Sequence, residues 1–313
     1  MQPRDHSPDQ MAPGEGIHTY VIAEVNGHAD LLRHLLGAID RFARRMSITY
    51  RIVFIGDIID YGPNSKQAMD IVNETLKRLP GSELILGDHE VHLLRLLDEV
   101  EWNERQKLLI GWMDKMGGSA TLASYGFNGR PEELGHIKQM IGRDHVAMLR
   151  RASRYVELER HVLVHAALEP GIAPADQRPE RMIFSNLSFV TYKDSFGKTV
   201  VHGGVASPSG TVESFPNRIA INTGAHRKRI LSALHIDPRG SVWAISARLG
   251  RNDPAPIVTD YPPRRKAIPA PPSPEELATR APQGPPRRPT DYVDHVPPRR
   301  GRPPRRSRPK VKP

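Results

Sequence analysis

Acidic and histidine residues follow four apolar segments of this sequence, each at the point where the segment ends. The groups begin at Glu24, Asp57, Asp88 and His165, and glycines flank most of them. Carboxylates and imidazoles are the side chains that bind metal ions and transfer protons in proteins. A single Asp-Gly pair is more often a solvated turn. Four such groups in succession favour a metal or acid–base site instead.

The apolar segments are typical of buried strands, because they are short, rich in β-branched residues and ended by turn residues. We expect strands at 17–24, 51–56, 83–86, 156–164, 198–202, 218–222 and 242–246. Ligands in α/β sheets bind beyond the carboxyl ends of strands, so side chains from four loops can converge there. Glycines permit the tight turns that bring these loops together.

Helical periodicity separates the first strands. Leu31, Leu35 and Ile39 recur at helical spacing after Asp30, which is placed to open a helix. A second helix is expected at 66–79, and residues 91–154 are predicted to be a mostly helical insert or cap. Strands thus alternate with helices at first and dominate later, which predicts an α/β fold with two packed sheets flanked by helices.

Composition divides the chain into three parts. Residues 1–15 show no apolar period and are predicted to be a flexible leader, followed by one globular domain at 16–250. Residues 251–313 hold 18 of the 30 prolines and carry 15 Lys and Arg against 6 Asp and Glu. Such a segment cannot bury enough apolar surface to fold, so we expect a disordered tail that carries most of the net charge of +10.

The tail contains four Pro-Pro-Arg-Arg repeats. Their arginines are Arg264, Arg265, Arg287, Arg288, Arg299, Arg300, Arg305 and Arg306. Guanidinium groups in this number could bind nucleic acid, an anionic membrane surface or an acidic protein, and the prolines could dock in an aromatic groove. Two tyrosines are few for base stacking. A solvated tail with no partner is the simplest alternative.

The chain has no cysteine, which excludes a disulfide scaffold, a thiolate metal site and a cysteine nucleophile. No apolar run approaches the ~20 residues that a membrane helix needs. The first residues also lack the apolar stretch of a signal peptide. We therefore expect a cytoplasmic protein without a membrane span.

The order and spacing of these groups resemble the calcineurin-like metallophosphoesterases. The sequence is most similar to the bacterial branch of the PPP serine/threonine phosphatases, and also to symmetrical diadenosine-tetraphosphatases. The matching segments are 21–36, 53–63, 84–94, 112–126, 162–171, 200–208 and 218–225. The resemblance implies a β-sandwich of two mixed sheets with helices outside. It also implies a pair of metal ions that activate a bridging water.

The resemblance places the metal-ligand positions on Glu24, Asn26, Asp57, Asp88, His165 and Gly204. In the family's Gly-Asp-x-His-Gly motif, Glu24 replaces the aspartate and Asn26 the histidine. The bridging aspartate is kept as Asp57 and one histidine as His165, whereas Asp88 replaces an asparagine. The histidine of the Gly-His-Thr motif has become Gly204, which offers no ligand. We assign His202, two residues earlier, only as a substitute that a bend in the chain could bring into place.

The phosphate grips are lost as well. Tyr61 stands where the second motif has an arginine, and Asn186 aligns with a second arginine. The acid dyad of the family is retained as Asp60 and His89. Without an activated water, this dyad has little to act on, and the remaining carboxylates repel a phosphate dianion.

Glycines and apolar strands persist in each motif while ligands are lost, which favours a pseudophosphatase that acts as a binding or regulatory module. We expect no bound metal; if an ion binds, the mainly oxygen set suits Mn²⁺ or Mg²⁺. A protein partner would then bind at the cleft. In a metal-free protein, His89 and His165 are buried, hydrogen-bonded histidines. The alternative is an active phosphoesterase with a rebuilt site, acting on phosphoproteins or dinucleoside polyphosphates.

Overall fold

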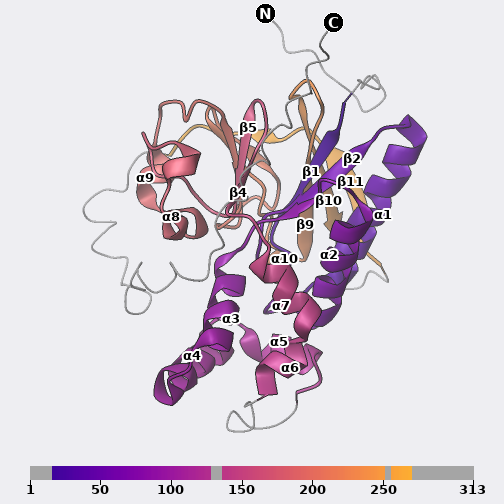
Figure 1. Ribbon diagram of the computed structural model, residues 1–313. Coiled ribbons are helices and arrows are strands. Elements are labelled where there is room, and N and C mark those ends of the chain that lie inside the picture. Colours follow the sequence, from indigo (N-terminus) through magenta and orange to yellow (C-terminus); the bar gives the residue numbers. More distant parts are fainter. Residues whose placement is uncertain (1–15, 128–135, 251–254, 270–313) are drawn as a thin grey trace, which may run out of the picture.

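Two six-stranded mixed sheets lie at the centre of the residues that the structure, a computed structural model, describes: 16–127, 136–250 and 255–269. The first sheet has the order β11-β10-β9-β1-β2-β3 and the second the order β12-β7-β8-β6-β5-β4 (Figure 1). The first comprises β1 (His18–Ile22), β2 (Tyr50–Phe54), β3 (Glu83–Leu84), β9 (Ile230–Ile236), β10 (Val242–Arg248) and β11 (Ile257–Tyr261). The second comprises β4 (Tyr155–Glu157), β5 (His161–Val164), β6 (Thr199–His202), β7 (Glu213–Ser214), β8 (Arg218–Ala220) and β12 (Arg264–Arg265).

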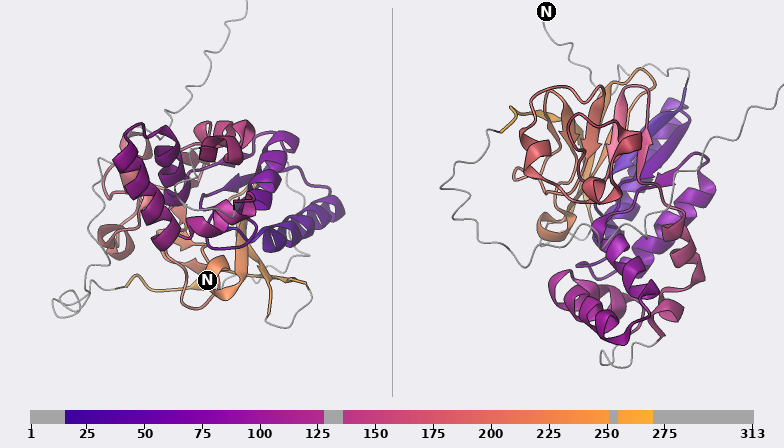
Figure 2. Two further views of the ribbon diagram at one scale, coloured as in Figure 1. Left: turned by 90° about the horizontal axis from the view of Figure 1, so that it is seen from below. Right: turned by 60° about the vertical axis from the view of Figure 1, so that its left-hand side comes forward.

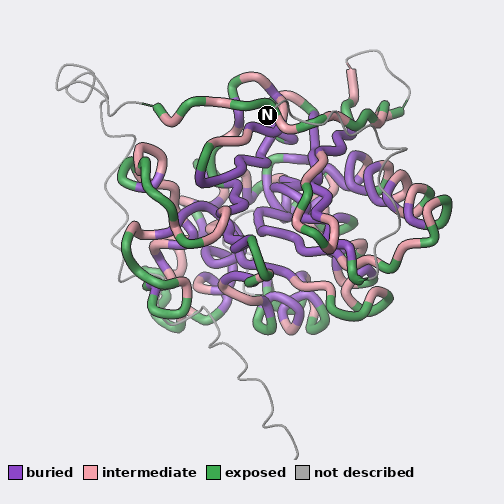
Figure 3. Tube along the Cα trace, turned by 90° about the horizontal axis from the view of Figure 1, so that it is seen from above, coloured by how far each residue is buried: buried purple, intermediate pink, exposed green. Residues whose placement is uncertain are grey.

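The central strands of the first sheet divide their side chains between two apolar layers. On β1, Val21 packs between the sheets with Leu163 and Val201, whereas Tyr20 and Ile22 face the helices. This alternation follows from the two-residue period of a strand. Both faces of β1 are therefore buried, and Figure 3 shows the buried trace concentrated in the interior of the molecule.

Helices cover the outer faces of both sheets. On the first sheet, α1 (Ala29–Met46) packs against β9, β10 and β11, and α2 (Ser65–Arg78) against β2. On the second, α8 (Pro179–Ile183) and α9 (Leu187–Thr191) contribute Met182 and Phe189 to an apolar cluster. A 3₁₀ turn at Pro174–Asp176 precedes α8, and α10 (Ala225–Lys228) precedes β9. The predicted fold class is therefore confirmed.

A helical lobe projects from the sandwich, as expected for residues 91–154 (Figure 2). It consists of α3 (Asp88–Asp98), α4 (Trp102–Lys115), α5 (Gly118–Ser124), α6 (Ile137–Ile141) and α7 (Arg143–Arg150). The first helix, α1, has His28 at its N-cap, and Asp30 lies in the first turn without a capping hydrogen bond. Asp30 thus contributes its negative charge to the helix N-terminus rather than a cap.

The structure differs from the predicted elements in several places. The segment 156–164 forms two antiparallel strands, β4 and β5, instead of one. Strands β7 and β9 were not predicted; β7 pairs with β8 and β12, and β9 pairs with β1 and β10. The folded part also extends beyond residue 250, because β11 pairs with β10 and β12 pairs with β7.

The strands beyond residue 250 lie between the prolines of this segment. β11 and β12 contain no proline, and Pro262 and Pro263 lie in the connection between them. Both are edge strands, so each pairs on one side only. Arg264 and Arg265 belong to the second sheet and not to the tail. The leader and the other repeat arginines lie outside the described residues. In the part of the chain that the structure describes, no helix has the length and apolar character to cross a membrane.

Candidate active site

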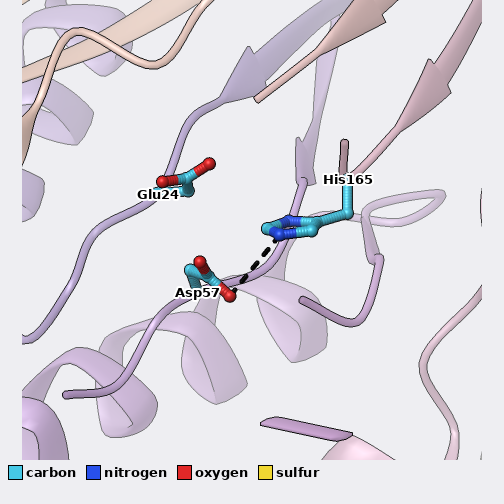
Figure 4. A group of neighbouring side chains, drawn as sticks. All are labelled: Glu24, Asp57 and His165. Carbon is cyan, nitrogen blue, oxygen red and sulfur yellow. Dashed lines mark ion pairs between the residues drawn. The ribbon is translucent and has the colours of Figure 1, made fainter. Parts of the chain in front are cut away.

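The side chains that follow the strands converge at one place between the sheets. Glu24 follows β1, Asp57 follows β2, and His165 follows β5 of the other sheet (Figure 4). One potential ligand atom from each lies within 4.8 Å of the others, and the same holds for Asp57, Asp88 and His89. Asp57 is common to both groups, as expected of the bridging ligand.

The backbone around these residues adopts conformations that side chains normally avoid. Positive φ angles occur at Asn26 (45°), Asp57 (52°), Asp60 (75°) and Tyr61 (59°). Such strain persists only where the surrounding structure enforces it, and it clusters at functional sites. Gly87 shows how tight the packing is: a Cβ there would lie 2.0 Å from Oδ1 of Asp57. The glycine is needed for the loops to close.

His165 faces two carboxylates. Its Nδ1 donates to the carbonyl oxygen of Ile55 over 2.6 Å, so Nε2 points to Asp57 and Asp88. Nε2 lies 3.6 Å from an oxygen of each of these acids. Burial alone would lower the pKa of His165, but the neighbouring Asp57 and Asp88 raise it to about 10. Burial raises the pKa of Asp57 itself, against the influence of His165 and His89.

Asp60 and His89, the pair predicted to be an acid dyad, lie in contact. Nδ1 of His89 lies 2.6 Å from Oδ2 of the fully buried Asp60. Asp60 also accepts hydrogen bonds from Trp112 Nε1 at 2.8 Å and Thr121 Oγ1 at 2.6 Å. Burial acts to lower the pKa of His89, but Asp57 and the bond to Asp60 raise it well above its ordinary value. No role was predicted for Trp112 or Thr121, although both lie in one of the matching segments.

Glu90 is a further residue whose role was not predicted from the sequence. Its carboxylate accepts hydrogen bonds from the backbone N–H groups of Asp57 at 2.8 Å and Ile58 at 2.7 Å. It also accepts bonds from Ile59 at 3.2 Å and Gly87 at 3.1 Å. Glu90 thus holds together the loops after β2 and β3. The signal available in the sequence was its place directly after His89, but the backbone partners require the folded loops.

Glu24 is bonded to the opposite sheet. One carboxylate oxygen accepts a hydrogen bond from the backbone N–H of Gly204, and the other accepts one from Nδ2 of Asn222. Burial, and then the nearby Asp57, raises the pKa of Glu24 to about 8. Each carboxylate oxygen of Glu24 therefore already accepts a hydrogen bond from the protein itself.

The position of the lost histidine leaves little space for a side chain. Gly204 has a φ of 79°, and a Cβ there would lie 2.8 Å from Cβ of Ala166. His202 does not substitute for it. Its Nδ1 bonds to the carbonyl of Gly203 at 2.9 Å, and its ring packs edge-on against Phe189. Burial lowers the pKa of His202 to about 4. It is a neutral residue of the apolar layer under α9.

The two residues that replace phosphate-binding arginines have other partners. Tyr61 stacks on His226 with ring centroids 4.0 Å apart and meets His89 edge-on at 5.2 Å. Asn186 is the N-cap of α9 and accepts a hydrogen bond from the N–H of Phe189 at 2.8 Å. Neither residue provides a cation, so the site offers no guanidinium at these two positions.

The donor set fits one ion better than two. Nε2 of His165 lies 3.6 Å from an oxygen of both Asp57 and Asp88, and two carboxylates beside an imidazole suit a divalent cation that prefers oxygen. Glu24, Asp57 and His165 also lie close together, but the Glu24 oxygens already accept hydrogen bonds, and Gly204 adds no ligand. A bound ion would supply positive charge to polarise a phosphate oxygen. The residues here would hold it in place.

Comparisons with known proteins identify the fold. Neither protein-family models nor curated proteins give a match. Among solved structures, a protein provisionally named a diadenosine tetraphosphatase is 19% identical with a TM-score of 0.52, over 76% of this chain and 97% of its own. A metallophosphoesterase from Sphaerobacter thermophilus is 12% identical with a TM-score of 0.43, over 75% of this chain and 89% of its own.

A protein serine/threonine phosphatase from Saccharomyces cerevisiae is 10% identical with a TM-score of 0.41, over 78% of this chain and 79% of its own. At such identities the likeness concerns the fold. The chain has the fold of the calcineurin-like metallophosphoesterases. The function of the chain depends on the chemistry of its site and not on the fold alone.

Proposed function

We propose that this protein is a pseudophosphatase: a metallophosphoesterase-fold protein that binds a partner at the cleft instead of hydrolysing phosphoesters. The hydrogen bonds of Glu24 carry the proposal. With one oxygen bonded to Gly204 and the other to Asn222, Glu24 joins the two sheets at a point where a metal ligand is expected. Each oxygen keeps a second lone pair, but an ion at this position would compete with two buried hydrogen bonds that already hold the carboxylate in place.

Loss of the phosphate grips supports the same function. Tyr61 and Asn186 are held by His226 and by α9, and neither offers charge to a phosphate. The catalytic acceleration of phosphoester hydrolysis depends on a paired metal centre and cationic clamps. A site without the metal pair and the cationic clamps keeps the shape of the cleft but lacks the electrostatic stabilisation that lowers the activation barrier of hydrolysis.

The alternative is a phosphoesterase that uses a rebuilt single-ion site. The approach of His165 Nε2 to within 3.6 Å of both Asp57 and Asp88 favours it. Such an enzyme would use Mn²⁺ or Mg²⁺ and would act on phosphoproteins or dinucleoside polyphosphates. The cytoplasmic location and a role of the remaining tail arginines in binding an anionic surface or nucleic acid are further proposals, which rest on composition.

Hydrolysis of an aryl phosphate with Mn²⁺ tests the proposal. The comparison is between wild type and a combined variant with Glu24→Asp, Asn26→His, Tyr61→Arg, Asp88→Asn and Gly204→His. Ala166→Gly is added to make space beside residue 204, where a Cβ would otherwise lie 2.8 Å from the Ala166 side chain. We expect turnover in the combined variant and none in wild type, with metal content measured for both.

Asp57→Asn in each background is the matched control, because it removes the shared ligand. Groups that act as a unit are not additive, so a single reversion should gain almost nothing. Wild-type turnover that depends on Asp57 and equals that of the combined variant would overturn the proposal in favour of the rebuilt enzyme.

A further inference from the structure

A cavity of about 400 Å³ lies between α1 and the β9-β10-β11 part of the first sheet. It is separate from the metal-like site: His235 in its lining pairs with Tyr20 on β1, four residues before Glu24. Four strand residues span about 13 Å. The volume falls within the range of about 300–1,000 Å³ that is typical of small-molecule sites. The polar and aromatic residues of the wall are Arg41, Phe42, Arg45, His235, Trp243, Thr259 and Asp260.

Aromatic rings form much of the wall. The ring of Phe42 meets that of His235 nearly edge-on, with centroids 5.9 Å apart, and His235 is stacked on Tyr20 at 4.4 Å. Trp243 is fixed by a hydrogen bond of 3.3 Å from its Nε1 to Oδ2 of Asp260. Rings held in this way present flat apolar surfaces to a planar ligand.

Two guanidinium groups accompany these rings. Arg41 and Arg45 lie one turn apart on the exposed side of α1, and the Arg45 guanidinium is 5.6 Å from the centre of the Phe42 ring. Within the described ranges, neither has a carboxylate at ion-pair distance, and the nearby Asp260 accepts its bond from Trp243. Arginine is the residue that binds carboxylate and phosphate groups most specifically.

A neutral imidazole completes the wall. His235 is 1% exposed and lines the cavity. Its Nε2 is 2.8 Å from Nδ1 of His18. Burial lowers the pKa of His235 to about 3, so the ring is neutral. The imidazole therefore presents an uncharged, flat ring to the cavity.

We propose that this cavity is a binding site for a small planar aromatic molecule that carries an anionic group. The ring lies between Phe42 and Trp243, and the anion pairs with Arg41 and Arg45. This site is independent of the pseudophosphatase assignment, because it shares no residue with the metal-like centre.

Titration calorimetry of the full chain with matched probes tests the site. 1-Naphthoate has the ring and the charge, 1-naphthamide has the ring alone, and cyclohexanecarboxylate has the charge alone. We expect 1-naphthoate to bind about tenfold more tightly than either control, which corresponds to about 1.4 kcal/mol. Equal affinity for 1-naphthoate and 1-naphthamide, or no binding of 1-naphthoate at millimolar concentration, would overturn the proposal.

Variants locate the binding. The double variant Arg41→Gln/Arg45→Gln should reduce 1-naphthoate affinity to that of 1-naphthamide, and Arg44→Gln, an exposed residue of the same helix outside the wall, should leave it unchanged. Ala38→Phe should fill the cavity and abolish binding of both aromatic probes. Unchanged 1-naphthoate binding in the double variant would show that it binds elsewhere. Since both arginines are exposed, this variant tests the site even if Ala38→Phe fails to fold.

Discussion

The two halves of the metal-like site are held together in different ways. On one side, Asp60, His89 and their supports Trp112 and Thr121 form a hydrogen-bonded network between the loop after β2 and the helical lobe. On the other, Glu24 is bonded to Gly204 and Asn222 of the second sheet. The first half thus ties the site to the helices, whereas the second joins the two sheets through a single carboxylate.

The largest effect is expected at Asp60. Asp60→Asn would place an amide N–H₂ against donors such as Trp112 Nε1 and remove the charge that pairs with His89. Breaking a buried pair of this kind costs about 3–5 kcal/mol. Urea unfolding should show this loss, whereas Glu104→Gln, at an exposed acid that pairs with the exposed Lys107, should leave stability nearly unchanged. A loss at Asp60 as small as at Glu104 would mean that the network is not structural.

A smaller loss is expected at Glu24. Glu24→Gln keeps the shape but directs an amide group at one of two donors, so about 1–3 kcal/mol should be lost. Asn222→Ala removes one donor of the same contact, and its effect should not add to that of Glu24→Gln. Additive losses in this double-mutant cycle would contradict the assignment of Glu24 as the bond between the sheets.

The same residue predicts a pH dependence in chelator-treated protein. The pKa of Glu24 is raised from 4.5 to about 8 by burial and then by Asp57, so the folded chain holds this proton more tightly than the unfolded chain. The contribution of Glu24 protonation to the free energy of unfolding is complete below pH 4.5 and is lost as the pH rises through 8. His165, whose pKa is raised to about 10 by its acidic neighbours against the effect of burial, extends the loss to higher pH.

Stability should therefore fall between pH 7 and 10, a range in which His202 and His235, whose pKa values burial lowers to about 4 and about 3, are neutral in both states. Glu24→Gln should make this fall shallower below pH 8, where Glu24 and His165 both contribute, and should leave it unchanged above pH 8, where His165 contributes alone. Denaturant unfolding at a series of pH values measures it. A slope that is unchanged in the variant would show that Glu24 does not bind this proton.

Removal of the last strands should have a modest effect. Truncation after residue 250 deletes β11 and β12, which pair along the edges of the two sheets and are largely exposed. We expect the melting temperature to fall by a few degrees, since a loss of about 1 kcal/mol shifts it by roughly 2–4 °C in a domain of this size. Truncation after residue 269 should leave it unchanged. Equal melting temperatures for the two truncations would show that these strands add no stability.

The sequence predicted the sandwich and the positions of Asp57, Asp60, His89 and His165, because each follows a short β-rich segment with a glycine turn. It did not predict the partners of Glu24, since Asn222 lies 198 residues away and reaches it only when the sheets are packed. Strand β9 was not predicted, whereas the strands at 218–222 and 242–246, which flank it in the sequence, were. Strand β11 was not predicted, because its five residues lie within a 63-residue segment whose proline-rich composition indicates a disordered tail.

The smallest effect is expected on removal of metal ions. If Glu24 joins the sheets through its own hydrogen bonds, the fold does not need an ion there, and chelator should leave the melting temperature of wild type unchanged. Added Mg²⁺ or Mn²⁺ at millimolar concentration should raise it only slightly, through Asp57, Asp88 and His165. Asp88→Asn is the matched variant, because it removes one carboxylate of this set and should abolish that slight rise. A large fall with chelator in wild type would place a tightly bound ion between the two halves of the site, and the contrast between them would then be one of metal ligation instead of lost function.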